Sequence, residues 1–326
     1  PPQDDLLALG FINFNAASFV ALHDSTRKEW PLPRTKSNPD DDEHNPGADN
    51  PADKFGYKAI LTDTDDVPLA ADLHRRDITI NSTALEITEN TIDTDAFDDV
   101  LPDDTTFEEC VCTIETAYGD RRFIDPFNAR RDIKHGGIRP VSDAFADDPL
   151  RALRAARYAA RYAAALNGEP FTLTDEMKHM MLQVASELNL MSRERIGEEI
   201  VKAMKQAAVP SRFWDTLQEA GVLAVIAPAL DRTRIIKPGP DKFHRETSTF
   251  THTMAVVDRM SELCDEQNIT GIDKARRLLM AVGHDLGKVR IADKKGGLWS
   301  DDPPERFGHH AQKGVEVVEE FCRRNG

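Results

Sequence analysis

The periodicity of the apolar residues changes near residue 147, and this change limits the folds that the chain can adopt. Before it, short β-like runs such as 11–14 and 18–23 are separated by turn residues, which predicts strands of a mixed α/β unit. From 147 to about 230 the pattern is rich in Ala, Leu and Met and has a helical period. We therefore predict an α+β protein in which a mixed α/β head is followed by an all-helical part.

A second helical module is expected beyond the Gly- and Pro-rich segment 235–243, which is typical of a linker. Three amphipathic helices are predicted after it, at 248–264, 272–288 and 309–324. A chain of 326 residues exceeds the usual size of a single core. We expect three parts with these bounds: a head at 1–146, a helical neck and body at 147–235, and a final helical domain at 248–326.

Two acidic stretches interrupt the head. Residues 37–55 are rich in Asp, Asn and Pro and lack an apolar period, which indicates a solvated loop. Residues 86–121 are also acidic, but their apolar positions are sufficient for a strand or two. Both stretches are expected to be insertions into the head.

The charge balance restricts the partners that the chain can bind. Acidic residues outnumber basic ones 57 to 41, a formal net charge of −16, which argues against charge-driven coating of nucleic acid. Any contact with nucleic acid must therefore be local. With 40% hydrophobic residues and no apolar run long enough to cross a bilayer, we expect a soluble globular protein without a membrane partner. The four cysteines are scattered, which fits a reducing, cytoplasmic setting.

Four arginines recur three or four residues apart in the segment 147–162, DDPLRALRAARYAARY. On a helix with about 100° per residue they share one sector of about 120°; they are Arg151, Arg154, Arg157 and Arg161. Spacing alone leaves two explanations open. One is a solvated face that acidic neighbours neutralise, and the other is a basic surface that binds a ligand.

A second polar constellation lies upstream, in the segment 71–85, ADLHRRDITINSTAL. Two isoleucines alternate with Thr79 and Asn81, so the polar side chains are expected on one side of a strand or strand end. The planar guanidinium of Arg76 is suited to holding a phosphate. An Arg–Asp pair that ties the strand to a helix explains the same residues equally well.

Three segments taken together resemble a known family. They are RRDITIN (75–81), IDPFNARRDIKHGGIRPV (124–141) and DDPLRALRAARYAARY (147–162). In order and spacing they closely resemble the bacterial-type, or class II, CCA-adding enzymes, which are tRNA nucleotidyltransferases related to bacterial poly(A) polymerases. The resemblance runs from residue 2 to the end of the chain, apart from the two insertions. It implies a polymerase-beta-like nucleotidyltransferase head followed by helical neck, body and HD domains.

The resemblance implies a function for the arginines. Cytosine and adenine each present an exocyclic amino donor beside a ring-nitrogen acceptor, whereas uracil and guanine present the opposite pattern. Asp148 and Arg151 look like the family's protein template, in which the carboxylate accepts from the amine and the guanidinium donates to the ring nitrogen. The other nucleotide-binding residues that the resemblance implies are Arg76, Asp77, Asn81, Arg154 and Arg157.

Nucleotidyl transfer to a tRNA 3′-hydroxyl needs paired carboxylates that hold Mg²⁺. In the family they belong to a glycine-rich strand–turn with an Asp-x-Asp pair near the N-terminus, and that motif is not found in its place. The aspartates at 40–42 and 62–66 are expected to face solvent, and Glu29 is either an auxiliary carboxylate beside the metal or a surface glutamate. We expect the strand–turn to precede Pro1 in the encoded protein; a chain inactive in transfer is the alternative.

Histidines and an aspartate form another constellation near the C-terminal end. His252 precedes the adjacent pair His284-Asp285, and two further histidines follow; imidazoles with a carboxylate suit a divalent transition metal. The set resembles the HD phosphohydrolase domain of some CCA-adding enzymes, which implies metal-dependent hydrolysis of phosphomonoesters or 2′,3′-cyclic phosphates. The implied metal ligands for Ni²⁺, Co²⁺ or Mn²⁺ are His252, His284, Asp285 and His310, with Lys288 on the phosphate. A helical bundle with buried histidines is the alternative, and the domain is expected to be incomplete at its C-terminus.

We predict a CCA-adding tRNA nucleotidyltransferase that adds C, C and A to the tRNA 3′ end from CTP and ATP, with an associated HD phosphohydrolase module. The expected partners are tRNA, CTP and ATP, and the expected cofactors are Mg²⁺ and a divalent transition metal. Three alternatives stay open: a poly(A) polymerase of the same superfamily, an HD phosphohydrolase with an inactive head, and a non-catalytic RNA-binding or assembly protein that keeps the fold.

Overall fold

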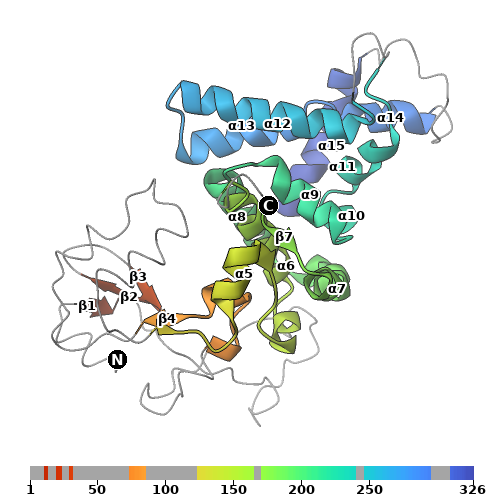
Figure 1. Ribbon diagram of the computed structural model, residues 1–326. Coiled ribbons are helices and arrows are strands. Elements are labelled where there is room, and N and C mark those ends of the chain that lie inside the picture. Colours follow the sequence, from red (N-terminus) through yellow and green to blue (C-terminus); the bar gives the residue numbers. More distant parts are fainter. Residues whose placement is uncertain are drawn as a thin grey trace, which may run out of the picture.

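The computed structural model of the chain describes residues 11–13, 20–23, 29–31, 73–85, 123–164, 170–239, 246–294 and 309–326. Both expected insertions and the aspartates at 40–42 and 62–66 lie outside these residues. Short strands lie at the N-terminal end and helices fill the C-terminal half (Figure 1), so the predicted α+β class is confirmed. Among the helices of the described part, none combines the length and apolar character needed to span a bilayer.

The N-terminal strands form one small antiparallel sheet. Its order is β1-β2-β3, with bounds β1 (Phe11–Asn13), β2 (Val20–His23) and β3 (Glu29–Pro31). Glu29 is the first residue of β3 and is in register with Leu22 of β2. Further along the chain β4 (Ala84–Leu85) pairs with β5 (Phe123–Ile124), again antiparallel.

The strand expected around Ile78 is largely replaced by a turn of helix, which corrects the alternation argument. Ile78 forms a single bridge with Pro140, and the 3₁₀ helix η4 (Thr79–Asn81) follows. Thr79 is buried together with its isoleucine neighbours, because its hydroxyl donates to Asp132 at 2.5 Å and its amide donates to the carbonyl of Arg139. The polar residues of this segment therefore do not share an outer face.

Helix α5 (Ala129–His135) starts and stops at sharply defined residues. The carboxylate of Asp125 accepts hydrogen bonds from the amides of Ala129 (2.7 Å) and Arg130 (3.0 Å), which satisfies the first two amides of the helix. Gly136, with φ 63°, ends it. The strand β6 (Gly137–Ile138) then pairs in parallel with β7 (Thr172–Leu173).

The centre of the molecule is a bundle of helices. The predicted arginine-rich helix is α6 (Leu150–Arg161), and it packs against α8 (Arg193–Gln206) and α9 (Ser211–Glu219). Five alanines of α6 are fully buried, which lets the neighbouring helices approach closely. The remaining elements of this part are α7 (Asp175–Val184), η7 (Ala185–Leu190), α10 (Leu223–Ile226), α11 (Pro228–Arg232) and η8 (Thr233–Ile235).

The C-terminal helices lie beside this bundle (Figure 1). They are α12 (Thr249–Glu266), α13 (Gly271–Gly283), α14 (Gly287–Lys294) and α15 (His310–Asn325). The single helix predicted at 272–288 is wrong at 284–286, because α13 ends at Gly283 and a turn at 284–286 separates it from α14. The end of α15 docks on the bundle, where Arg324 Nε donates to the carbonyl of Val225 at 2.9 Å.

Candidate nucleotide and metal sites

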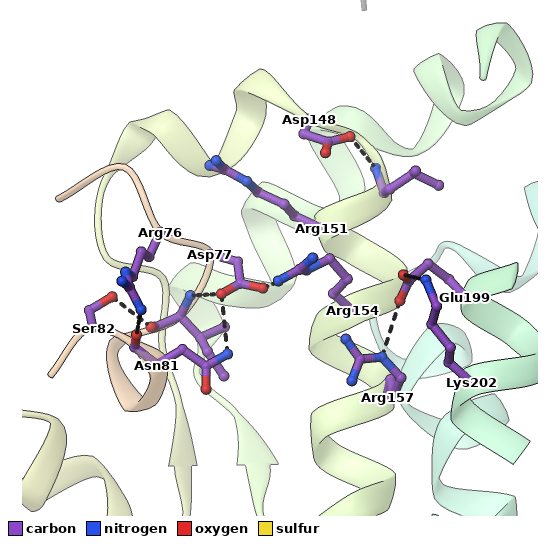
Figure 2. Close-up of polar contacts among 12 residues, drawn as sticks. Arg76, Asp77, Asn81, Ser82, Asp148, Arg151, Arg154, Arg157, Glu199 and Lys202 are labelled. Atoms are coloured by element: carbon purple, nitrogen blue, oxygen red, sulfur yellow. Dashed lines mark hydrogen bonds and ion pairs between the residues drawn. The ribbon is translucent and has the colours of Figure 1, made fainter. Parts of the chain in front are cut away.

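Asp77 joins the segment before η4 to α6 through a partly buried ion pair. Its Oδ2 lies 2.7 Å from Nε of Arg154, and its Oδ1 accepts from the amide of Ile78 and the side chain of Asn81 (Figure 2). The Asp77 side chain is only 4% exposed. Burial alone would raise the pKa of Asp77, but Arg154 outweighs it and holds the pKa below its usual range.

Arg76 lies on the other side of the same segment. Its Nη1 donates to the carbonyl of Asn81 at 2.9 Å, across the turn of η4 (Figure 2). The structure therefore brings three sequence-predicted residues, Arg76, Asp77 and Asn81, into one hydrogen-bonded turn that faces Arg154 of α6. The sequence also allowed an Arg–Asp pair that ties this segment to a helix without any ligand. The contact between Asp77 and Arg154 of α6 is such a pair.

Asp148 and Arg151 stand together at the start of α6. Asp148 Oδ1 accepts from the amide of Leu150 at 3.1 Å, and its Oδ2 lies 3.7 Å from Nη2 of Arg195 on α8. The guanidinium of Arg151 donates to the carbonyls of Ala144 and Arg75. Within the described part of the chain no ion pair joins Asp148 to Arg151, and the guanidinium of Arg151 points away from the Asp148 carboxylate (Figure 2).

Arg157 is a buried member of the stripe. Its Nε lies 3.1 Å from Oε2 of Glu199, and its Nη1 donates to Gln206 at 3.1 Å. Lys202 Nζ donates to the other oxygen of Glu199 (Figure 2). This contact fastens α6 to α8. Arg157 therefore does not lie on a solvated, neutralised helix face. Among the four arginines of α6, only Arg161 is exposed.

Two residues of this region were missed by sequence reasoning. Arg195 and Glu199 both belong to α8 and contact Asp148 and Arg157. In the sequence they stand in a polar run, RERIGEE, that looks like the solvated face of an amphipathic helix. The burial of Glu199, which only the structure shows, marks it as a paired residue, because a charged residue is rarely buried without a partner.

The second constellation converges on Asp285 at the turn between α13 and α14. His252, His284 and Asp285 each offer one ligand atom, and these atoms all lie within 4.8 Å of one another. The Nε2 atoms of His284 and His252 lie 3.3 and 3.9 Å from Asp285 Oδ2. His310, from α15, places its Nε2 at 3.4 Å from Oδ1. All four predicted metal ligands are therefore together.

The histidines are oriented by contacts behind them. His284 Nδ1 donates to the carbonyl of Ala281 at 2.6 Å, so the lone pair of the neutral imidazole is on Nε2. His252 Nδ1 lies 3.0 Å from Oε1 of Glu246, a partner that the sequence did not indicate. Imidazoles held in this way and turned toward a carboxylate fit a divalent transition metal.

Lys288 supports the carboxylate from inside the protein. Its Nζ donates to Asp285 Oδ2 at 2.6 Å and to the carbonyl of Pro238 at 2.7 Å, and its side chain is 6% exposed. Burial alone would raise the pKa of Asp285, but His284 and Lys288 hold it well below its usual range. Burial alone would lower the pKa of His284, yet Asp285 raises it. The expected phosphate role of Lys288 stays a prediction.

Two family models match the helical half of the chain. Residues 170–233 match a family described as the probable RNA and SrmB-binding site of polymerase A. Residues 249–326 match the HD domain.

Curated relatives match almost the whole chain. A multifunctional CCA protein of Shewanella frigidimarina is 32% identical over 98% of this chain and 62% of its own length. The multifunctional CCA protein of Pasteurella multocida is 31% identical, over 98% and 62%. This chain thus spans about 62% of the length of these relatives. The resemblance to CCA-adding enzymes with an HD domain is confirmed.

Solved structures of the same kind are similar to the chain at lower identity. The CCA-adding enzyme of Bacillus stearothermophilus in complex with CTP is 18% identical, with a TM-score of 0.46 over 98% of this chain and 70% of that one. An apo form of a CCA-adding enzyme is 17% identical, with a TM-score of 0.46 over 91% and 60%.

Proposed function

We propose that the protein is a CCA-adding tRNA nucleotidyltransferase that adds C, C and A to tRNA 3′ ends from CTP and ATP. The similarity to multifunctional CCA proteins over 98% of the chain supports this. The observation that carries it is the Asp77–Arg154 contact, because it brings together two motifs that stand 77 residues apart in sequence and leaves the Arg154 side chain partly exposed beside them.

Nucleotide selection is assigned to the start of α6. A carboxylate beside a guanidinium complements the amino donor and ring-nitrogen acceptor that cytosine and adenine share. Asp148 and Arg151 supply these groups, and their contacts to Leu150, Ala144 and Arg75 fix both before a base arrives. A fixed template loses little conformational entropy on binding, which favours discrimination over adaptability.

The remaining arginines divide into two roles. Arg76 and Arg154 are partly exposed beside the template and are proposed to contact the incoming nucleotide. Arg157 is held by Glu199 and Gln206, so we assign it the positioning of α6 against α8, and its place among the nucleotide contacts stays a prediction. Mg²⁺ supplies charge neutralisation on the triphosphate when bound. Glu29, at the start of β3, stays a predicted auxiliary carboxylate.

A second activity, metal-dependent phosphohydrolysis, is favoured by the cluster around Asp285. The substrate class that the HD resemblance implies is phosphomonoesters or 2′,3′-cyclic phosphates. His252, His284, Asp285 and His310 would hold the ion, which supplies Lewis-acid activation of water when bound. Lys288 keeps Asp285 ionised and fixed, and Glu246 orients His252.

Nucleotide addition is tested in a hybrid protein. The 62% of the Shewanella frigidimarina relative that matches this chain is replaced by these 326 residues, and a labelled tRNA transcript without its CCA end is the substrate. We expect C, C and A to be added in order, followed by a stop. The unaltered relative is the control.

The other outcomes of this assay separate the alternatives. Addition of adenine alone, to RNA ends other than tRNA, would show a poly(A) polymerase. A hybrid that binds CTP but extends nothing would contradict the proposed transfer and leave the HD phosphohydrolase and the non-catalytic RNA-binding protein.

A further inference from the structure

The outer face of α5 concentrates positive charge in a chain that is strongly acidic overall. Ala129 and Ile133 of this helix are buried, whereas its four basic residues are exposed; they are Arg130, Arg131, Lys134 and His135. The helix thus presents three permanent cations and a histidine on one side, whereas the whole chain has a formal net charge of −16.

The neighbouring carboxylates do not belong to this face. Asp132, the one acid of α5, accepts from Thr79 at 2.5 Å and forms an ion pair of 2.9 Å with Arg139. Both carboxylate oxygens of Asp125 accept hydrogen bonds from the amides of Ala129 and Arg130. Within the described residues, neither Arg131 nor Lys134 has an ion pair with a carboxylate.

Helix stability does not account for the arrangement. Lys134 and His135 stand in the last turn, where a positive charge is favourable to the helix dipole. Arg130 and Arg131 stand in the first turn, where positive charge opposes the dipole and costs up to about 1 kcal/mol per charge. Arg131, an exposed arginine at this unfavourable place with no carboxylate partner among the described residues, indicates an anionic partner.

We propose that this outer face of α5 binds the phosphate backbone of RNA. A net negative chain repels a polyanion at long range, so binding requires a local positive surface of this kind. Helix α5 packs on η4, which belongs to the same turn as Arg76 and Asp77. The face therefore lies in the part of the molecule that holds the proposed nucleotide site, and outside residues 170–233, which match the RNA-binding family model.

The inference rests on the proposed function only for the identity of the RNA, a tRNA without its CCA end. The test variant is R130Q/R131Q/K134Q in the 326-residue chain. The matched control is R259Q/R276Q/R277Q, which removes three charges from exposed arginines of α12 and α13. Binding of a labelled tRNA transcript without CCA is measured by fluorescence anisotropy at about 50 to 200 mM salt.

We expect the α5 variant to bind at least tenfold more weakly at the lower salt and to reduce the slope of log K against log salt by about 2 to 3. The control variant should keep both. Equal losses in the two variants, or no loss in the α5 variant, would overturn the proposal.

A second variant guards against a folding defect. R130Q/R131Q removes only the charges that oppose the dipole, so its melting temperature should equal or exceed that of the original chain, and about two units of the slope change should remain. Failure of the original chain to bind CTP would contradict the proposed function but not the RNA-binding role of α5, because RNA binding is measured without nucleotide.

Discussion

Asp77 and Arg154 lie 2.7 Å apart across 77 residues of sequence, and the aspartate is almost fully buried while the arginine is 40% exposed. The pair therefore has one side in the protein and one side open. A buried carboxylate fixes the guanidinium from behind, and the outer donors of Arg154 stay in reach of a ligand. This arrangement suits recognition of an anionic group at the junction of head and bundle.

Asp77→Asn should lower the free energy of unfolding at pH 7 by about 1.5–3 kcal/mol, because a charged hydrogen bond is lost beside a buried group. The pKa of Asp77 lies below its usual 3.8 in the folded protein, so its contribution is complete above that value and is lost as pH falls through the folded pKa. Urea unfolding at pH 7 and at pH 3 should show the difference between the two proteins shrinking in acid.

The control for this change is Asp273→Asn, which removes an exposed ion pair with Arg276 in which both side chains are 69% exposed. It should cost less than about 0.5 kcal/mol. Equal effects of the two substitutions would contradict the buried role of Asp77.

Asp215→Asn should stabilise the protein at pH 7.5 and not at pH 4. Burial raises the pKa of Asp215 to about 6, and Glu219 and Asp258 add to the rise against the opposing charge of Arg212. A carboxyl whose folded pKa is raised costs stability once pH exceeds its unfolded value, so the stability of the original protein falls as pH rises from about 4 to 6. The gain, discounted for partial exposure, is about 1–2 kcal/mol; thermal melts across pH that show no gain would refute it.

Asp285→Ala should abolish binding of Ni²⁺, Co²⁺ or Mn²⁺ at the cluster, because Asp285 lies within reach of three imidazoles. Glu246→Gln should weaken metal affinity by about 10- to 100-fold through the orientation of His252. Calorimetric titration with each ion measures both. Asp293→Ala, at an exposed ion pair with Arg232, is the control and should bind metal unchanged.

Hydrolysis should follow metal binding. The original protein with added ion is expected to hydrolyse 2′,3′-cyclic nucleotides, a chelator should remove that activity, and Asp285→Ala should lack it while CTP binding persists. Metal binding by Asp285→Ala as tight as that of the original chain would contradict the site.

Gly287→Ala should disturb the crossing of α14 and α15. A Cβ at Gly287 would collide with the carbonyl of His310 and with the backbone of Gly314, so the helices must separate, at a cost of about 1–3 kcal/mol. His310 would move away from Asp285, and metal affinity should fall. Gly137→Ala is the control, since the nearest atom to its Cβ is 3.9 Å away. If Gly287→Ala and the control had the same unfolding midpoint, the close contact between α14 and α15 at Gly287 would be contradicted.

Local patterns predicted the features that local physics controls. The apolar period gave α6 and α12 close to their observed bounds, and the adjacent His284-Asp285 pair indicated the cluster. The strand expected at Ile78 failed because the hydroxyl of Thr79 bonds to Asp132, 53 residues away, and two-residue alternation does not encode that partner. The helix expected to run through to Lys288 failed because its period continues across the turn at 284–286.

Contacts between helices could not be predicted from one sequence. Glu199 and Arg157 are 42 residues apart, and each alone fits a solvated helix face. Glu246 stands beside a linker and gave no signal of its contact with His252. Such pairs depend on how helices cross, which composition and period leave undetermined.

Selection of cytosine and adenine by Asp148 and Arg151 is the central claim, and the ratio of CTP to UTP affinity in the 326-residue chain and in Asp148→Ala tests it most directly. The control is Asp143→Ala, an exposed aspartate of the neighbouring η6 (Asp143–Asp147). Loss of the acceptor for the amino group should reduce the CTP preference by about 1–3 kcal/mol, or about 5- to 150-fold, while the control keeps it. A CTP preference that is unchanged in Asp148→Ala would contradict the account.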